Sequence, residues 1–203
     1  MCSTDFLRFD PQTGRTTRVT VVAGIPRPTA NPARAGASEN DPVPSNVVLG
    51  PDGNFYVGLL TGFPTVTGGA KVLRVTPDGA VSDAVTGLTS VSWVAFGPDG
   101  LLYIVEFGVE APNSGRILRM LADGTKQVVA DGLNDPNGVA FDKVGNLYVA
   151  VNGSTAPNDG PLGQILRMDG IAKIAPNSQP AAAMSASASR NPSVHSIRRL
   201  GDG

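Results

Sequence analysis

Five side chains could bind a ligand, because they carry oxygen atoms or a large aromatic ring close to the ends of predicted strands. They are Asn46, Trp93, Glu106, Asn137 and Asn152. The first two and Asn137 lie at or beside one register of three related segments, and the other two end the strand that follows. Amide and carboxylate oxygens are ligands of hard cations such as Ca²⁺, which needs about 6–8 of them. These residues could therefore contact a small molecule or a protein, or hold part of a cation site.

The same residues also have ordinary structural explanations. Asn137 can cap the turn before a strand, Glu106 can be a solvated charge at a strand end, and Trp93 can fill a hydrophobic core. Arginines such as Arg74 and Arg119, which recur at one register, could form an anion-binding ring. A recurring arginine more often packs its stem on the sheet and leaves its guanidinium in water. We expect the structural explanation for all of these residues.

Motifs of the common catalytic and metal sites are missing from the sequence. The only histidine, His195, has no neighbouring group with which it could activate a nucleophile. HExxH, CxxC, EF-hand and phosphate-binding glycine-loop motifs do not occur, and the Asp-x-Gly sequences are typical of turns. The sequence thus leaves enzymatic activity uncertain, assigns no catalytic residue and favours a binding role.

The charge balance and the lack of long apolar runs exclude several partners. Lysine and arginine number 16 against 17 acidic residues, so nothing predicts a surface for nucleic acid. No apolar run approaches the ~18 residues of a membrane span. Met1–Asp10 lacks the features of a signal peptide, and the single cysteine, Cys2, cannot form an internal disulfide.

The strands that position these residues come from a repeat, best seen in Val91–Leu133. Two short apolar runs flank the turn Gly97–Gly100, which is the pattern of a tight hairpin. A second pair of runs flanks Ala122–Thr125 in the same way. Each unit therefore predicts four short antiparallel strands.

Two recurring residue types give the period of the repeat. The strand tyrosines Tyr56, Tyr103 and Tyr148 are spaced by 47 and 45 residues. An arginine recurs one strand later at positions 8, 74, 119 and 167, where the first interval is lengthened by a proline-rich insertion. A period near 46 with four strands falls close to the ~40–50 residues of a β-propeller blade. We predict an all-β fold of propeller type.

The strand count predicts between three and four blades, which cannot close a ring. The predicted parts are a half blade at 5–25, blades at 44–88, 91–133 and 136–170, and an Ala/Ser-rich, disordered tail at 171–203. An open arc leaves apolar blade faces bare, so we expect self-association through them.

Three segments fall outside the regular repeat. Pro26–Pro44 is rich in proline and predicts an irregular surface loop. Ile171–Ala175 could be a short fourth strand of the last blade, whereas the resemblance of Ser196–Gly203 to a half unit is taken as chance. We expect Pro26–Pro42 and Ser178–Ser193 to be the mobile segments, cleaved first by proteases.

Several stretches resemble the ScyD/ScyE-type family of bacterial propellers, which is related to NHL-repeat proteins. The stretches are Asp5–Pro11, Val43–Gly53, Tyr56–Gly58, Leu60–Pro64, Gly68–Ala70, Asn152–Ser154 and Gly163–Arg167. The likeness covers residues 5 to 169 and only the C-terminal part of the family's propeller. It implies a six-bladed, extracytoplasmic (periplasmic or secreted) propeller, and it supplies no catalytic residue.

Two function hypotheses remain. The first is a binding or scaffold module that uses no cofactor. The second is a calcium-assisted enzyme, because Pro136-Asn137-Gly138 resembles the Pro-Asn-Gly of six-bladed lactonases, in which that asparagine is a calcium ligand. Under this alternative Asn137 and Glu106 would bind the metal in a lactonase-like or lyase-like reaction.

Overall fold

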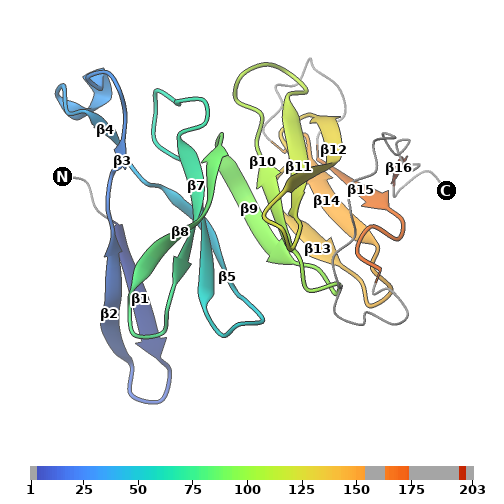
Figure 1. Cartoon of the computed structure of the whole chain (residues 1–203), viewed down its shortest axis with the longest axis horizontal. Helices are drawn as coiled ribbons and strands as arrows, with labels where there is room; N and C mark the ends of the chain where they lie inside the picture. The colour runs from blue at the N-terminus through green and yellow to red at the C-terminus, as the bar shows by residue number, and fades with distance from the viewer. Residues whose placement is uncertain (1–3, 154–162, 174–196, 200–203) are drawn as a thin grey trace.

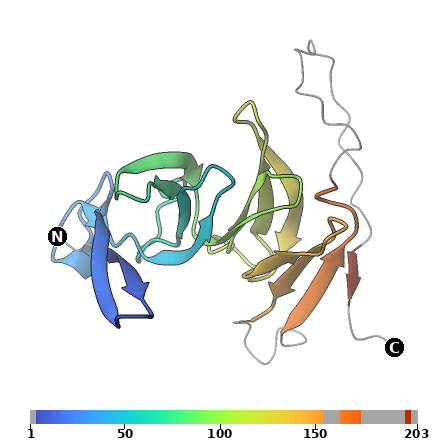
Figure 2. The same cartoon turned by 90° about the horizontal axis from the view of Figure 1, so that it is seen from below.

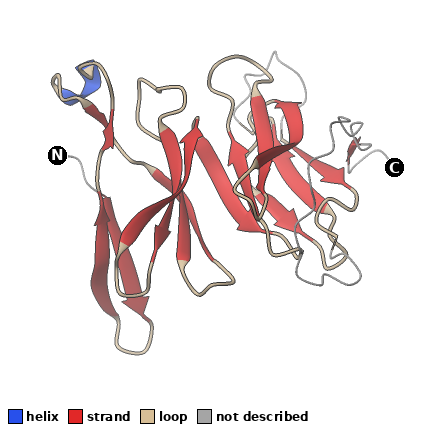
Figure 3. Cartoon of the chain, viewed as in Figure 1, coloured by secondary structure: helices blue, strands red, loops and turns tan. Residues whose placement is uncertain are grey.

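The computed structural model describes residues 4–153, 163–173 and 197–199. Nearly all of its regular structure is β-strand, and the one short 3-10 helix that it describes lies near the N-terminal end (Figure 3). No helix within these ranges is long and apolar enough to cross a membrane.

Twelve of the strands form three four-stranded antiparallel sheets, each with its strands side by side in chain order. The first sheet contains β5 (Pro44–Leu49), β6 (Phe55–Leu59), β7 (Ala70–Val75) and β8 (Val81–Leu88). The second contains β9 (Val91–Phe96), β10 (Leu102–Glu106), β11 (Gly115–Met120) and β12 (Lys126–Leu133). The third contains β13 (Val139–Phe141), β14 (Leu147–Val151), β15 (Gln164–Met168) and β16 (Ile197–Arg199).

A separate two-stranded sheet precedes them, made of β1 (Thr4–Asp10) and β2 (Arg15–Val22). Figures 1 and 2 show this hairpin at one end of the molecule and the three sheets following it as successive blades. The expected all-β architecture of propeller blades in an open arc is thereby confirmed, with a half blade followed by three four-stranded blades.

Apolar side chains between successive sheets hold the arc together. One buried cluster joins the hairpin β1–β2 to the first sheet, and a second joins the first sheet to the second. The third and largest cluster joins the second sheet to the third and centres on the fully buried Tyr103, Ile117 and Leu147. A sheet that lies between two neighbours is covered on both faces. Its strands therefore need no strict alternation of polar and apolar residues.

The first hairpin turn of each blade depends on a glycine with positive φ. Gly53, Gly100 and Gly145 have φ of 77°, 77° and 85°, a region that only glycine enters without strain. The repeat had predicted these conformations. At Gly145 a side chain would also meet the backbone of Ala172, at 2.6 Å.

The end of the third blade differs from the prediction. Its fourth strand is β16, paired with β15, whereas Ile171 and Ala172 lie in a turn. Ala172 is fully buried and its N–H donates to Gly145 O (2.9 Å), because its small side chain fits into the cluster between the last two sheets. The chain beyond residue 170 therefore contributes both a buried turn and a strand. The predicted mobile segment Ser178–Ser193 lies outside the described residues.

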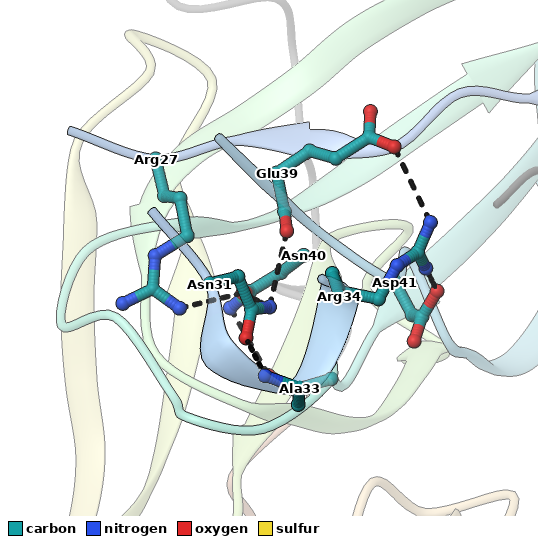
Figure 4. Close-up of polar contacts among 8 residues, drawn as sticks. Arg27, Asn31, Ala33, Arg34, Glu39, Asn40 and Asp41 are labelled. Carbon is teal, nitrogen blue, oxygen red and sulfur yellow. Dashed lines mark hydrogen bonds and ion pairs between the residues drawn. The ribbon is translucent and has the colours of Figure 1, made fainter. Parts of the chain in front are cut away.

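The proline-rich insertion is more regular than its composition predicts. It contains β3 (Ile25–Pro26) paired with β4 (Glu39–Asn40), and the short helix η1 (Pro32–Arg34). Two buried asparagines replace the missing apolar core, Asn31 at 0% and Asn40 at 2% exposure. Asn31 Oδ1 caps the helix by accepting from Ala33 N at 2.9 Å (Figure 4).

Asn40 ties the insertion to the loop after β6. Its Oδ1 accepts from Asn31 Nδ2 (2.7 Å) and Arg27 Nη1 (3.2 Å). Its Nδ2 donates to the carbonyls of Gly62 (3.0 Å) and Pro64 (2.9 Å). Every hydrogen-bonding position of this buried amide is thus used, so hydrogen bonds connect the insertion to the loop after β6. The early cleavage of Pro26–Pro42 by proteases stays a prediction.

We expect the substitution Asn40→Ala to destabilise the protein by about 1–3 kcal/mol, because it leaves buried polar partners unsatisfied. The exposed Asn137 provides the matched control, since Asn137→Ala should change stability by less than about 0.5 kcal/mol. Urea denaturation followed by circular dichroism measures both. Equal stability of the two variants would show that the insertion folds without this amide.

Candidate functional site

Two of the five residues singled out in the sequence join neighbouring blades. Asn46 on β5 clasps the backbone of Val94 on β9, where its Nδ2 donates to the carbonyl (2.8 Å) and its Oδ1 accepts from the N–H (2.9 Å). Trp93 is half-buried and packs against the cluster between the second and third sheets. Both side chains act in packing, as the structural explanation of Trp93 predicted.

Glu106 is buried with 3% exposure at the end of β10, so it is not the solvated charge that the sequence suggested. Its Oε1 accepts from the N–H of Thr89 and its Oε2 from Nε of Arg116 on the paired strand β11. The hydrogen bond that Arg116 donates to Glu106 raises the pKa of Arg116 above its ordinary value. Each carboxylate oxygen thus already has a donor within the fold.

The remaining two candidates lie at the junction of β12, β13 and β14. Asn152 adopts φ 59°, and its Oδ1 accepts from Asn134 Nδ2 at 3.1 Å. The Asn137 side chain is exposed, and the backbone N–H of Asn137 donates to Ala150 O (2.9 Å). No described group of three or more His, Cys, Asp or Glu side chains could hold a metal ion. None of the hydrogen bonds described for these residues joins one of the five to another.

The recurring arginines occupy the same place in each blade. Arg74, Arg119 and Arg167 lie directly across from the strand tyrosines of their blades. In the first blade Arg74 Nε and the Tyr56 hydroxyl both donate to Asp52 Oδ2, at 3.0 and 3.2 Å. Arg119 Nη1 donates to Ile171 O at the start of the turn that packs on the third blade (2.9 Å), and Arg119 and Arg167 lie over the tyrosine rings of their own sheets. These contacts agree with a structural role.

Asp52 gives the protein a specific acid sensitivity. The side-chain amide of Asn54, followed by its backbone N–H and by Arg74 and Tyr56, lowers the pKa of Asp52 from 3.8 to about 2. A depressed carboxyl pKa stabilises the fold above 3.8, and this contribution is lost as the pH falls towards about 2. We expect Asp52→Asn to flatten the fall in melting temperature between pH 4 and about 2. Thermal scans across that window that are parallel for variant and wild type would contradict this.

A surface groove of about 400 Å³ lies between the hairpin β1–β2 and the first sheet. It is predominantly apolar, with Arg8 as its one charged residue. The lining residues are Phe6, Leu7, Arg8, Val19, Val47, Leu49, Phe55 and Pro77. The neighbouring edge of β1 has no strand partner within the described residues, because β1 pairs only with β2.

Comparison of the three blades shows what is unusual at this groove. Val47, Val94 and Val139 occupy the same place on the first strand of each blade, and they are 51%, 1% and 8% exposed. Leu49 is 60% exposed, whereas the matching Phe96 is half-buried. The inner strands of the preceding blade cover these positions in the second and third blades. Within the described residues the groove therefore occupies the place of an inter-blade interface, and no inner strands cover it there.

The groove residues were not predicted, although the sequence carries a signal for them. Residues 5–22 match only the second half of a repeat unit, and an open arc was expected to leave blade faces bare. The side chains on the exposed face could be identified only from the strand registers.

No protein-family model and no curated protein matches this sequence. Three solved structures resemble it: streptogramin B lyase (18% identity, TM-score 0.49), a protein assigned provisionally as a gluconolactonase (16%, 0.43) and a protein of unknown function from Bacteroides caccae (15%, 0.48). The matches cover 77%, 82% and 93% of this chain, but only 42%, 60% and 51% of those proteins. This chain thus spans about half the length of the structures it resembles.

Proposed function

We propose that this protein is a binding module that takes up a polypeptide segment at the groove between β1–β2 and the first sheet. The observation that carries the proposal is the exposure of Val47 and Leu49 beside the unpaired edge of β1. An extended segment can add to such an edge through main-chain hydrogen bonds while its side chains fill the adjacent pocket. The groove volume also falls within the ~300–1,000 Å³ of typical binding sites.

The apolar lining supports a polypeptide occupant over a small charged ligand. Val47 and Leu49 are 51% and 60% exposed, so burying the rest of the two side chains offers about 1–2 kcal/mol each. Arg8 is the one charged residue of the lining, so an acidic group of the bound segment would be oriented towards it. The resemblance to the ScyD/ScyE-type family, the extracytoplasmic location that it implies and self-association through blade faces remain predictions.

The calcium-assisted alternative would require a rearrangement of Glu106. Its two oxygens accept from Thr89 and Arg116, and a cation at this place would have to displace both donors. Asn137 supplies at most one further oxygen, far short of about 6–8. No contact in the described part of the chain favours this function over the binding role.

A labelled peptide with the sequence of residues 136–151, which form the β13–β14 hairpin, tests the proposal in a fluorescence anisotropy titration of the full chain. We expect saturable binding that falls at least about tenfold in Leu49→Asp, because a carboxylate would then be desolvated in the groove. Val128→Asp is the matched control, since Val128 is 49% exposed on the outer strand β12. Circular dichroism checks that both variants fold.

Two outcomes would reject this function. One is the absence of binding up to millimolar peptide. The other is binding that Leu49→Asp and Val128→Asp leave equally strong, which would place the peptide elsewhere on the surface.

A further inference from the structure

Two asparagines of the chain are followed directly by glycine, in Asn137-Gly138 and Asn152-Gly153. An asparagine in this position can lose its side-chain amide when the next backbone nitrogen attacks it, since glycine has no Cβ to hinder the approach. The reaction needs a side chain that is free to rotate and a backbone N–H that can give up its proton. The structure gives the two pairs different freedom.

The Asn137 side chain lies free on the surface between β12 and β13. It is exposed, and no hydrogen bond of its Oδ1 or Nδ2 is described in the part of the chain that the structure covers. The preceding residue, Pro136, is buried, and its carbonyl accepts from Ser92 Oγ at 3.0 Å. The backbone before Asn137 is thus anchored, while its amide group can rotate in water.

The attacking atom in this pair is the backbone nitrogen of Gly138. Within residues 4–153 no hydrogen bond of this N–H is described, whereas the Gly138 carbonyl accepts from Ala150 N at 3.0 Å. Apart from its chain neighbours, no heavy atom lies within 4 Å of the place that a Cβ on Gly138 would take. The Asn137 side chain can therefore approach this nitrogen through open space.

Asn152 lacks this freedom, because the fold holds both its side chain and its backbone. Its Oδ1 accepts from Asn134 Nδ2 (3.1 Å), and its N–H donates to Asn134 O (2.9 Å). Its carbonyl accepts from Gly163 N (3.2 Å). Breaking these hydrogen bonds costs free energy before the side chain can turn towards Gly153. The second pair is therefore protected from the same reaction.

We propose that Asn137 is a site of spontaneous deamidation, a covalent modification that converts its amide into a carboxylate. Gly138 N bonds to Asn137 Cγ as its proton passes to water, and the Cγ–Nδ2 bond breaks with release of ammonia. Water then opens the resulting succinimide at either carbonyl, which leaves aspartate or isoaspartate at position 137. This inference goes beyond the proposed function, because it needs no bound partner.

The isoaspartyl product would loosen the start of the third blade. It places an additional backbone carbon between position 137 and Gly138. Two hydrogen bonds to Ala150 span this linkage, one from the Asn137 N–H to Ala150 O (2.9 Å) and one from Ala150 N to Gly138 O (3.0 Å). Both cannot keep their geometry across the longer backbone. We therefore expect the Ala150 amide to lose protection from hydrogen exchange in the modified chain.

Incubation of the full chain at mildly alkaline pH, followed by tryptic digestion and mass spectrometry, tests the proposal. Asn137 and Asn152 fall in different peptides, 127–143 and 144–167. We expect Asn137 to deamidate at least about tenfold faster than Asn152, which must first break its hydrogen bond from Asn134. In urea, where the fold holds neither side chain, the two rates should become similar.

Gly138→Ala is the matched variant, because a methyl group has room at this position but hinders the backbone nitrogen. It should deamidate at Asn137 at least about tenfold more slowly than wild type, since the reacting atoms can no longer come as close. Circular dichroism checks that the variant folds. A native chain in which Asn152 reacts as fast as Asn137, or in which Asn137 reacts only in urea, would overturn the proposal. Equal rates in wild type and Gly138→Ala would also overturn it, because Gly138 would then not be the attacking residue.

Discussion

Replacing Ile117 by alanine should lower the free energy of unfolding by about 2–5 kcal/mol, whereas Ile165→Ala should cost less than about 1 kcal/mol. The two isoleucines occupy the same place on the third strand of successive blades. Ile117 is 0% exposed between the second and third sheets, and Ile165 is 44% exposed on the outer face of the last sheet. The difference between the two losses therefore measures how much stability one side chain gains when a neighbouring blade buries it.

Trp93 makes this experiment direct, because it is the only tryptophan and packs against the same cluster. Its fluorescence reports unfolding of that interface in urea, and circular dichroism reports the sheets as a whole. Equal losses in the two variants would mean that the last sheet is covered on both faces, which would contradict the open arc.

Removing the partner of Glu106 should have the second large effect. We expect Arg116→Ala to destabilise the protein by about 1–3 kcal/mol, because it leaves a carboxylate of 3% exposure with only the Thr89 N–H as a donor. The 44% exposure of the Arg116 side chain keeps this below the loss expected for a fully buried pair, since water can partly replace it.

The double variant Arg116→Ala with Glu106→Gln separates charge from packing. A glutamine retains an oxygen for the Thr89 N–H and removes the buried charge, so most of the stability should return. Urea titrations of the three variants measure the coupling between the two positions. A double variant no more stable than Arg116→Ala would show that the arginine stabilises the sheet through its stem alone.

The sequence predicted the blades because their strands carry local signals. Gly53 and Gly100 identify the hairpin turns, and the tyrosine and arginine registers align the units without reference to distant residues. β16 carried only a faint signal, since its partner β15 is about 30 residues away in the chain. The insertion was predicted to be irregular because two buried asparagines, Asn31 and Asn40, perform what apolar residues usually do.

The candidate site was harder to predict, because each side chain's role depends on a partner from another element. Glu106 is buried by Arg116 and the Thr89 backbone, and Asn46 is used by the backbone of Val94. Neither partner follows from a motif. The incomplete first unit predicts that a blade face is exposed. The exposure of Leu49 in particular could be predicted only with the register between β5 and its neighbours.

The most direct test of the account is hydrogen exchange of the full chain with and without the 136–151 peptide. The central claim is that the free edge of β1, beside Val47 and Leu49, receives an added strand. It predicts that amides of Phe6–Phe9 gain protection on binding, while those of the edge strand β12 do not change. Bound peptide with unchanged exchange in β1, or equal protection of β1 and β12, would contradict it.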